Sequence, residues 1–307
     1  MTNGETAHDG HEPPPFRIAD PPQRVSGMRV LPGWALPGKP EGLDDVEEDA
    51  WRQTGFVCAE EWRLLEANLD IQARLSATGY QATARTMTMA AYASLWSRAF
   101  LLISDAAALV RRGAYQSAIP LLRNAVEMVA AQHGLTGEMD EWRRWTHESY
   151  GRHEPTRSIE VGLGQYFSGE SIASDPHLRL IYRAASDLSR PNFGPTALFT
   201  AEGASHERYP LVFADRAFHL GWTQLLLGWA LRTGLAQLHE VLHLAQHFPA
   251  SAELRAEAVT HVRAAEAALD AGGRCHAEEW DDPRGRRRTI LADFRRKPSD
   301  APVRILF

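Results

Sequence analysis

The sequence contains little cysteine, no surplus of positive charge and no long unbroken apolar run. Cys58 and Cys275 are the two cysteines among 307 residues, which excludes a disulfide framework and a paired-cysteine metal motif. The chain has 33 lysines and arginines against 39 aspartates and glutamates, so its net charge of −6 gives no general attraction to nucleic acid or to an acidic membrane. We therefore expect a reducing compartment, and a local patch for any nucleic-acid contact.

The sequence also lacks the features of secreted and membrane proteins. The opening stretch MTNGETAHDGHEPPP has no basic segment followed by an apolar one, so we expect no signal peptide. A membrane-spanning helix needs about 20 apolar residues in a row. Charged residues interrupt both of the most apolar stretches, namely Arg98 and Asp105 in one, and Asp215, Arg216 and Arg232 in the other. These observations predict a soluble, cytoplasmic protein without a membrane partner.

Apolar residues recur at helical spacing along most of the chain. Leu95, Leu102, Ala106 and Leu109 form one stripe, and Gly113 is suited to end that helix. We expect a helical hairpin over residues 86–134, and further helices over about 59–78, 138–150, 157–167, 175–189, 214–247 and 251–271. The sequence shows no alternating strand pattern. It therefore predicts an all-α fold, an antiparallel helical bundle with a long central helical hairpin.

Composition divides the chain into three parts. Residues 1–44 are rich in proline and glycine, which predicts a disordered leader, with Trp34 as a local anchor on the domain. Residues 45–272 carry the helical pattern and form the predicted bundle domain. Residues 273–307 are charged and rich in arginine, and we expect a tail there.

Two segments carry a resemblance to a known family. The first is RRGAYQSAIPLLRNAVEMVAAQ, which combines a glycine-bearing turn, an alanine-rich start and an R-x-x-x-E pair, Arg123 and Glu127. The second is SDLSRPNFG, which is similar to an L-S-x-x-x-H-P-N loop, with Arg190 in place of the histidine and Asn192 retained. These features resemble the DUF5677-like bacterial proteins of unknown function, which are similar to the HEPN superfamily of helical domains.

The resemblance implies a helical fold and a role in RNA-linked stress or phage defence. Nuclease members of the wider superfamily use an arginine and a histidine to cleave RNA. Arg190 stands here where the loop pattern has its histidine, so the resemblance carries over the fold and not the catalysis. We expect a non-catalytic or weakly catalytic binding or regulatory protein. Its ligand site is predicted at Arg123, Glu127, Arg190 and Asn192. The alternative is that Arg123 and Glu127, four residues apart on one helix, form a structural pair that holds the loop.

A histidine motif, HEVLH at residues 239–243, matches the pattern of zinc metalloproteases. His239 and His243 can share one metal on a helix, with Glu240 as general base. Glu240-x-x-His243 also fits part of a di-iron site, which needs a second such motif on a facing helix. On a helical wheel His239 lies at the flank of the apolar stripe and His243 toward the opposite face. The sequence thus predicts no cofactor, and it leaves a metal-dependent hydrolase with zinc or iron as an alternative function.

The predicted partners follow from the tail and from the long apolar helices. The arginines of RGRRR are suited to phosphate or to an acidic protein surface, so we expect an RNA or protein partner there. The helices favour a homodimer. A small-molecule enzyme on the same bundle is a third functional option. The predicted partner-binding arginines are Arg284, Arg286, Arg287 and Arg288.

Overall fold

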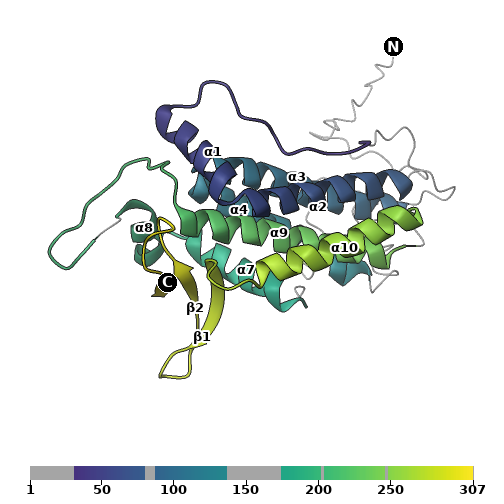
Figure 1. Cartoon of the computed structure of the whole chain (residues 1–307). Coiled ribbons are helices and arrows are strands. Elements are labelled where there is room, and N and C mark those ends of the chain that lie inside the picture. Colours follow the sequence, from purple (N-terminus) through teal and green to yellow (C-terminus); the bar gives the residue numbers. More distant parts are fainter. Residues whose placement is uncertain (1–30, 80–86, 137–173, 202–203, 246–247, 307) are drawn as a thin grey trace, which may run out of the picture.

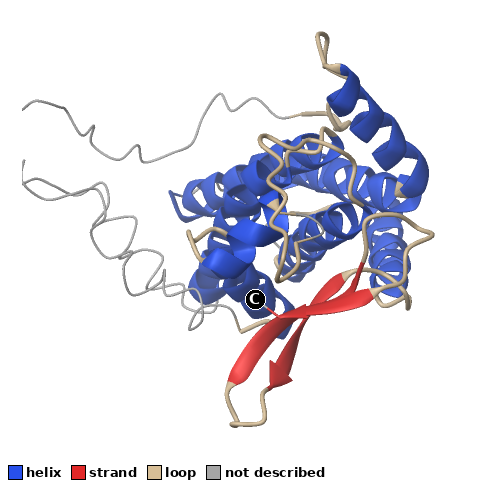
Figure 2. Ribbon diagram, turned by 90° about the vertical axis from the view of Figure 1, so that its left-hand side faces the viewer, coloured by secondary structure: helices blue, strands red, loops and turns tan. Residues whose placement is uncertain are grey.

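A computed structural model of the chain describes residues 31–79, 87–136, 174–201, 204–245 and 248–306. This part of the chain forms eight helices that pack side by side and three strands at one end of the bundle (Figures 1 and 2). The elements are α1 (Asp45–Val57), α2 (Ala59–Gly79), α3 (Met87–Arg111), α4 (Tyr115–Thr136), α7 (Pro176–Leu188), α8 (Phe193–Thr200), α9 (Leu220–His243), α10 (Ala252–Leu269), β1 (His276–Asp281), β2 (Arg287–Phe294) and β3 (Val303–Leu306).

The hairpin of α3 and α4 and the buried helix α9 make the core. α3 packs along α4, and α9 contacts α2, α3 and α4. The apolar stripe of α9 is fully buried at Leu227, Leu231 and Leu238, because neighbouring helices cover it. Gly113 turns the chain between α3 and α4 at φ +73°, a conformation that glycine adopts without strain. The predicted central helical hairpin is therefore confirmed.

Buried amide side chains connect three helices inside this core. The Trp96 indole N–H of α3 donates to Gln72 Oε1 of α2 at 2.7 Å. Gln72 Nε2 in turn donates to Asn68 Oδ1 at 2.7 Å and to the Gly234 carbonyl of α9 at 3.1 Å. A Cβ at Gly234 would lie 2.5 Å from Asn68 Oδ1, so this close approach requires glycine. The network fixes α2, α3 and α9 relative to one another.

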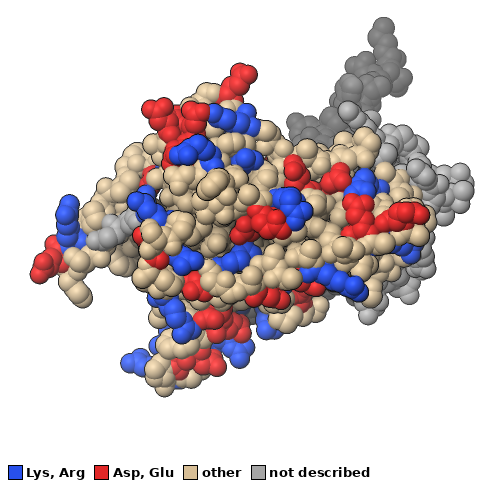
Figure 3. All heavy atoms as spheres, viewed as in Figure 1, with Lys and Arg blue, Asp and Glu red and all other residues tan. Residues whose placement is uncertain are grey.

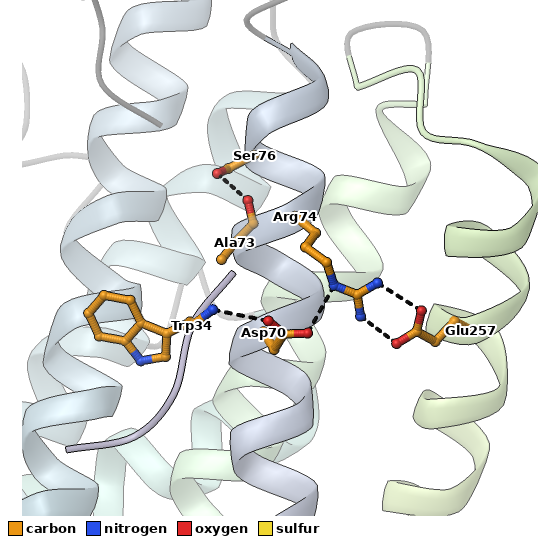
Figure 4. A network of polar contacts seen from close by, with 6 residues as sticks. All are labelled: Trp34, Asp70, Ala73, Arg74, Ser76 and Glu257. Atoms are coloured by element: carbon orange, nitrogen blue, oxygen red, sulfur yellow. Dashed lines mark hydrogen bonds and ion pairs between the residues drawn. The ribbon is translucent and has the colours of Figure 1, made fainter. Parts of the chain in front are cut away.

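The segment before α1 lies along α2 and α3. Trp34 meets Phe100 edge to face at 5.0 Å, and its backbone N–H donates to Asp70 Oδ1 at 3.0 Å. Asp70 also accepts from Arg74 at 2.9 Å, and Arg74 forms a two-pronged pair with Glu257 of α10 (Figure 4). Trp34 therefore anchors this segment, and the same polar network ties α10 to α2.

The C-terminal segment folds as a three-stranded antiparallel sheet in the order β1–β2–β3, so the prediction of an all-α fold is wrong there. Asp282 sets the β1–β2 turn, because its carboxylate accepts the backbone N–H groups of Arg284 and Arg286, and Gly285 adopts φ +71°. The strands show no alternation because β2 is buried at four consecutive residues, 289–292, while β1 is largely exposed. The fold is mostly helical with a small sheet.

The helices also differ from the sequence-based expectation at particular residues. α1 was not predicted, although Asp44 caps it by accepting the N–H groups of Val46 and Glu47. α8 lies in what was expected to be a loop. α9 begins at Leu220 rather than at residue 214, because Ala214 adopts φ +57° and the N-cap residue His219 has an extended backbone. The helices expected over 138–150 and 157–167 lie outside the described residues.

One described helical stretch, Tyr92–Arg111 of α3, is long and apolar enough to cross a membrane by length and composition alone. Half of its most apolar window is buried inside the bundle. The core helix of a water-soluble bundle has the same composition, because an all-round apolar helix is buried by its neighbours.

Candidate ligand site

A cavity of about 690 Å³ lies where the bundle meets the sheet. Its walls come from the turn that opens α4, from α8, from the segment that leads into α9, and from β2 with the residues up to β3. We call it the His219 cavity, after the histidine in its wall. These segments are far apart in sequence, and the small sheet closes one side of the space that they enclose.

His219 is the N-cap residue of α9. Its Nδ1 accepts a hydrogen bond from the backbone N–H of Trp222 at 3.3 Å, which satisfies one of the unpaired N–H groups at the start of the helix. A ring nitrogen that accepts a hydrogen bond carries no proton, so the neutral imidazole carries its proton on Nε2. Among the described residues none accepts a hydrogen bond from this Nε2–H. His219 therefore offers a donor at the cavity wall.

Tyr115 and Thr223 hold the backbone of His219 in place. The His219 N–H donates to the Tyr115 hydroxyl at 3.0 Å, and the Thr223 hydroxyl donates to the His219 carbonyl at 2.9 Å. Because that bond uses the single hydroxyl proton of Thr223, Tyr115 is the donor in the 3.1 Å contact between the two hydroxyls. The three residues form a closed ring of hydrogen bonds, which fixes the position of the imidazole.

Burial determines the charge of this cluster. Desolvation lowers the pKa of His219 to about 4, against a smaller opposing effect of the Asp215 and Asp300 carboxylates. Desolvation also raises the pKa of Tyr115 to about 12, although the hydrogen bond from the His219 N–H opposes this. At neutral pH the imidazole is therefore uncharged, and the phenol keeps its proton.

Aromatic rings form the floor of the cavity. Phe199 of α8 stacks on Trp222 of α9 with ring centroids 4.4 Å apart and planes 16° apart. Phe294 of β2 meets Trp222 edge to face at 5.1 Å and lies 4.7 Å from the His219 ring. Such pairs contribute about 0.5–1.5 kcal/mol each beyond the area that they bury. Trp222 is 2% exposed and Phe294 6%, so Phe199 is the least covered of the three rings.

Charged side chains line the cavity above this floor. They are Arg216, Arg295 and Arg296 on the positive side and Asp215 and Asp300 on the negative side. Both carboxylates accept hydrogen bonds from backbone N–H groups, and Asp215 Oδ2 lies 3.9 Å from Arg296. α4 begins at this wall and has no acidic residue in its first turn, so the positive end of its dipole is uncompensated there. With three arginines against two carboxylates, the cavity wall carries a small surplus of positive charge.

The α3–α4 turn approaches the cavity wall without any intervening side chain. A Cβ at Gly113 would lie 1.9 Å from the carbonyl oxygen of Arg216 and 2.7 Å from its carbonyl carbon. Both atoms belong to the backbone, so no side-chain rotation relieves the overlap. Gly113 therefore positions the strand-like segment that carries Asp215, Arg216 and His219.

The structure brings together two of the four residues of the predicted site. Arg123 donates from Nη2 to Glu127 at 3.0 Å and to the Tyr182 hydroxyl at 2.8 Å, and from Nε to the Ser186 hydroxyl at 3.0 Å. Its guanidinium also lies 4.9 Å from the centre of the Tyr182 ring. Arg123 thus ties α4 to α7, which is the arrangement expected of a structural pair.

The other two residues of that predicted site lie at the junction of α7 and α8. Arg190 is exposed, and its ion pair is with Asp187 at 3.5 Å rather than with Glu127. Asn192 is exposed as well and occupies the N-cap position of α8, where its side chain makes no capping hydrogen bond. None of the four residues lines the His219 cavity.

His239, Glu240 and His243 of the HEVLH motif all line one cavity of about 370 Å³, but they lie near different neighbours. His239 is exposed and lies 3.6 Å from Glu266, whereas Glu240 lies 3.7 Å from His133. His243 is exposed, as expected from the helical wheel. In the described part of the chain, no three histidine, cysteine, aspartate or glutamate side chains are grouped so that they could hold a metal ion.

The arginines of the predicted partner site lie on the β1–β2 hairpin, where acidic side chains pair with three of the four; Arg284 has no ion pair among the described residues. Arg286 lies 2.8 Å from Asp282, and Arg288 lies 3.7 Å from the same carboxylate. Arg287 lies 3.4 Å from Glu279 across the strands. Acidic and basic atoms alternate over the tip of this hairpin at the lower edge of the molecule (Figure 3). The hairpin therefore presents no concentrated positive charge.

No sequence motif marks the His219 cavity. The residues that line it come from three separate ranges, 113–117, 194–222 and 294–306, and only the fold joins these ranges. A local signal was present in the histidine before the apolar run of α9, since a helix start needs a side-chain acceptor. Comparison with known proteins finds no matching family model, no similar curated protein and no similar solved structure.

Proposed function

We propose that this protein is a non-catalytic or weakly catalytic binding protein, and that it holds a small aromatic carboxylate in the His219 cavity. The observation that carries the proposal is the neutral His219 ring, fixed as an Nε2–H donor in the wall of an aromatic-floored cavity. A volume of about 690 Å³ lies within the range of small-molecule sites, which is roughly 300–1,000 Å³.

The cavity wall offers two kinds of contact, one apolar and one polar, and a ligand must satisfy both. Phe199, backed by the stacked Trp222 ring, offers a flat apolar surface that matches an aromatic ring. The Nε2–H of His219 matches an oxygen acceptor, and an anionic acceptor gives the stronger hydrogen bond. Arg216, which also lines the cavity, adds positive charge nearby. An aromatic ring that carries a carboxylate satisfies both parts at once.

The same contacts argue for binding rather than for acid–base catalysis. A general base needs a free nitrogen lone pair, and the only lone pair of the His219 ring accepts the Trp222 N–H. Burial raises the pKa of the Cys58 and Cys275 thiols to about 12, so neither is a ready nucleophile. Ser117 lines the cavity but has no hydrogen bond to a base among the described residues. The polar groups hold and orient a ligand.

Calorimetric titration of the full chain with benzoate and 2-naphthoate tests the proposal, with benzamide and 2-naphthamide as uncharged counterparts. We expect the carboxylates to bind, and 2-naphthoate to bind more tightly because its second ring covers more of the aromatic floor. Failure of both carboxylates to bind would overturn the proposal, and so would equal binding of acids and amides.

His219→Asn is the matched variant for this test. Asparagine is a good N-cap residue, so its oxygen replaces Nδ1 as acceptor for the Trp222 N–H, while the Nε2–H donor is lost. We expect unchanged helicity and at least tenfold weaker binding of 2-naphthoate. His177→Asn, at an exposed histidine outside the cavity, is the control and keeps wild-type affinity. Wild-type affinity of His219→Asn would place the ligand elsewhere.

A further inference from the structure

The segment between α8 and α9 presents an apolar surface that the bundle does not cover. It leaves the body of the molecule as a long protrusion at the left of Figure 1. Phe213 is 92% exposed, Leu211 65% and Tyr209 49%, and Phe193 at the start of α8 is 77% exposed beside them. We call these four residues, together with Val212, the loop patch. Exposed apolar patches of a few hundred Å² mark interaction sites.

Local hydrogen bonds give the protrusion a defined shape. The Ser205 hydroxyl accepts the backbone N–H groups of Glu207 and Arg208, and the Ser205 N–H donates to the Arg208 carbonyl at 2.7 Å. Further along, the Val212 N–H donates to the carbonyl of Thr200 at 2.7 Å, at the end of α8. The apolar side chains are therefore displayed on a braced turn.

The protrusion also carries two charges of opposite sign next to each other. Glu207 and Arg208 form no ion pair with any described residue. Charged atoms of both signs are visible on the protrusion in the space-filling view (Figure 3). A two-fold axis beside the turn brings Glu207 of one copy against Arg208 of the other, and the reverse, so the charges are complementary to themselves. Because the two charges cancel, they give the patch no attraction to an anionic lipid surface.

We propose that the loop patch is the two-fold interface between two copies of this chain. The three aromatic and two aliphatic side chains of the loop patch together expose on the order of 400–500 Å² per copy, since a buried aromatic side chain covers about 150–250 Å². Two copies together reach about 1,000 Å², the lower limit of a specific interface. The patch borders the His219 cavity but does not depend on the proposed ligand, because its exposure and charges are independent of it.

Sedimentation velocity on the full chain tests the interface. We expect a dimer for the wild type, and an increase in the dimer Kd on the order of 100-fold for the double variant Leu211→Ser with Phe213→Ser. Phe56→Ser is the matched control, because Phe56 is 86% exposed on α1, away from the patch, and the variant remains dimeric. Circular dichroism checks that all variants keep their helices.

Charge exchange gives a second, independent test. Glu207→Arg places like charges against each other and raises the dimer Kd about tenfold, and the added change Arg208→Glu restores the wild-type value. A monomeric wild type would overturn the proposal, whether or not it cosediments with phosphatidylserine vesicles. Equal dissociation of the Phe56→Ser and loop-patch variants would also overturn it.

Discussion

The close approach of Gly113 to Arg216 leads to a sharp prediction about stability. Gly113→Ala introduces a Cβ at a residue with φ +73°, where an L side chain costs roughly 1–2 kcal/mol. The same Cβ lies 1.9 Å from the Arg216 carbonyl oxygen, so the two backbone segments must separate. Overlaps of this kind add about 1–3 kcal/mol. We expect Gly113→Ala to lower the free energy of unfolding by about 3 kcal/mol.

Gly42→Ala separates the two contributions. Gly42 has the same φ of +73°, and a Cβ there meets nothing within 4 Å. Its variant therefore carries only the backbone cost, which the lower entropy of the unfolded chain partly offsets, leaving about 1 kcal/mol. Urea unfolding followed by circular dichroism measures both variants against the wild type.

The difference in the free energy of unfolding between the two variants tests the close backbone contact at Arg216. A gap of about 2 kcal/mol supports the close backbone contact at Arg216. Gly113→Ala should also weaken 2-naphthoate binding, because Arg216 moves with the cavity wall, whereas Gly42→Ala should leave it unchanged. Equal destabilisation of the two variants would refute the reasoning.

Three further predictions concern His219, Gly234 and Arg123. The pKa of His219 is about 4 in the folded protein, against an ordinary value of 6.5, so the unfolded chain binds a proton more readily. The free energy of unfolding therefore falls as the pH drops from 6.5 to 4, by up to about 3 kcal/mol. Urea unfolding of His219→Asn should show a flatter dependence on pH. Gly234→Ala should lower the stability of the protein in thermal unfolding by about 1–3 kcal/mol, because the added Cβ overlaps Asn68. Alanine by itself favours a helix over glycine, so a gain in stability would contradict the overlap. Arg123→Ala should lower the free energy of unfolding by about 1–3 kcal/mol, because the hydrogen bonds to α7 are lost, and it should leave the affinity for 2-naphthoate unchanged. A loss of affinity at unchanged stability would instead support the ligand site predicted at Arg123.

The helical part of the fold could be predicted because the spacing of the apolar residues and the residues that end helices indicate the same elements. Ala106 and Leu231 lie in stripes at helical spacing, and both are fully buried. Gly113 ends a helix where the sequence indicates. The sheet was missed because β2 gains its burial from α9 and the end of the bundle rather than from a pattern of its own, and its hairpin turn, Asp282 to Gly285, was the available signal.

The candidate site could not be read from the sequence for a different reason. The Arg123–Glu127 pair was visible because its residues lie four apart on one helix, and the predicted contact is present. The His219 cavity depends on the packing of Phe199, Trp222 and Phe294 from three elements, and on a hydrogen bond that selects one imidazole tautomer. Neither is encoded in local spacing.

The central claim is that neutral His219 offers its Nε2–H to a carboxylate in the cavity. Nitrogen-15 NMR of the histidine rings at pH 7, with His219→Asn to assign the signal, tests it most directly. We expect a His219 ring protonated on Nε2 alone, whose Nε2–H resonance shifts when 2-naphthoate is added, while the Nδ1 signal stays that of an acceptor. A ring protonated on Nδ1, or an Nε2–H resonance that 2-naphthoate leaves unmoved, would show that His219 does not bind a carboxylate in this way.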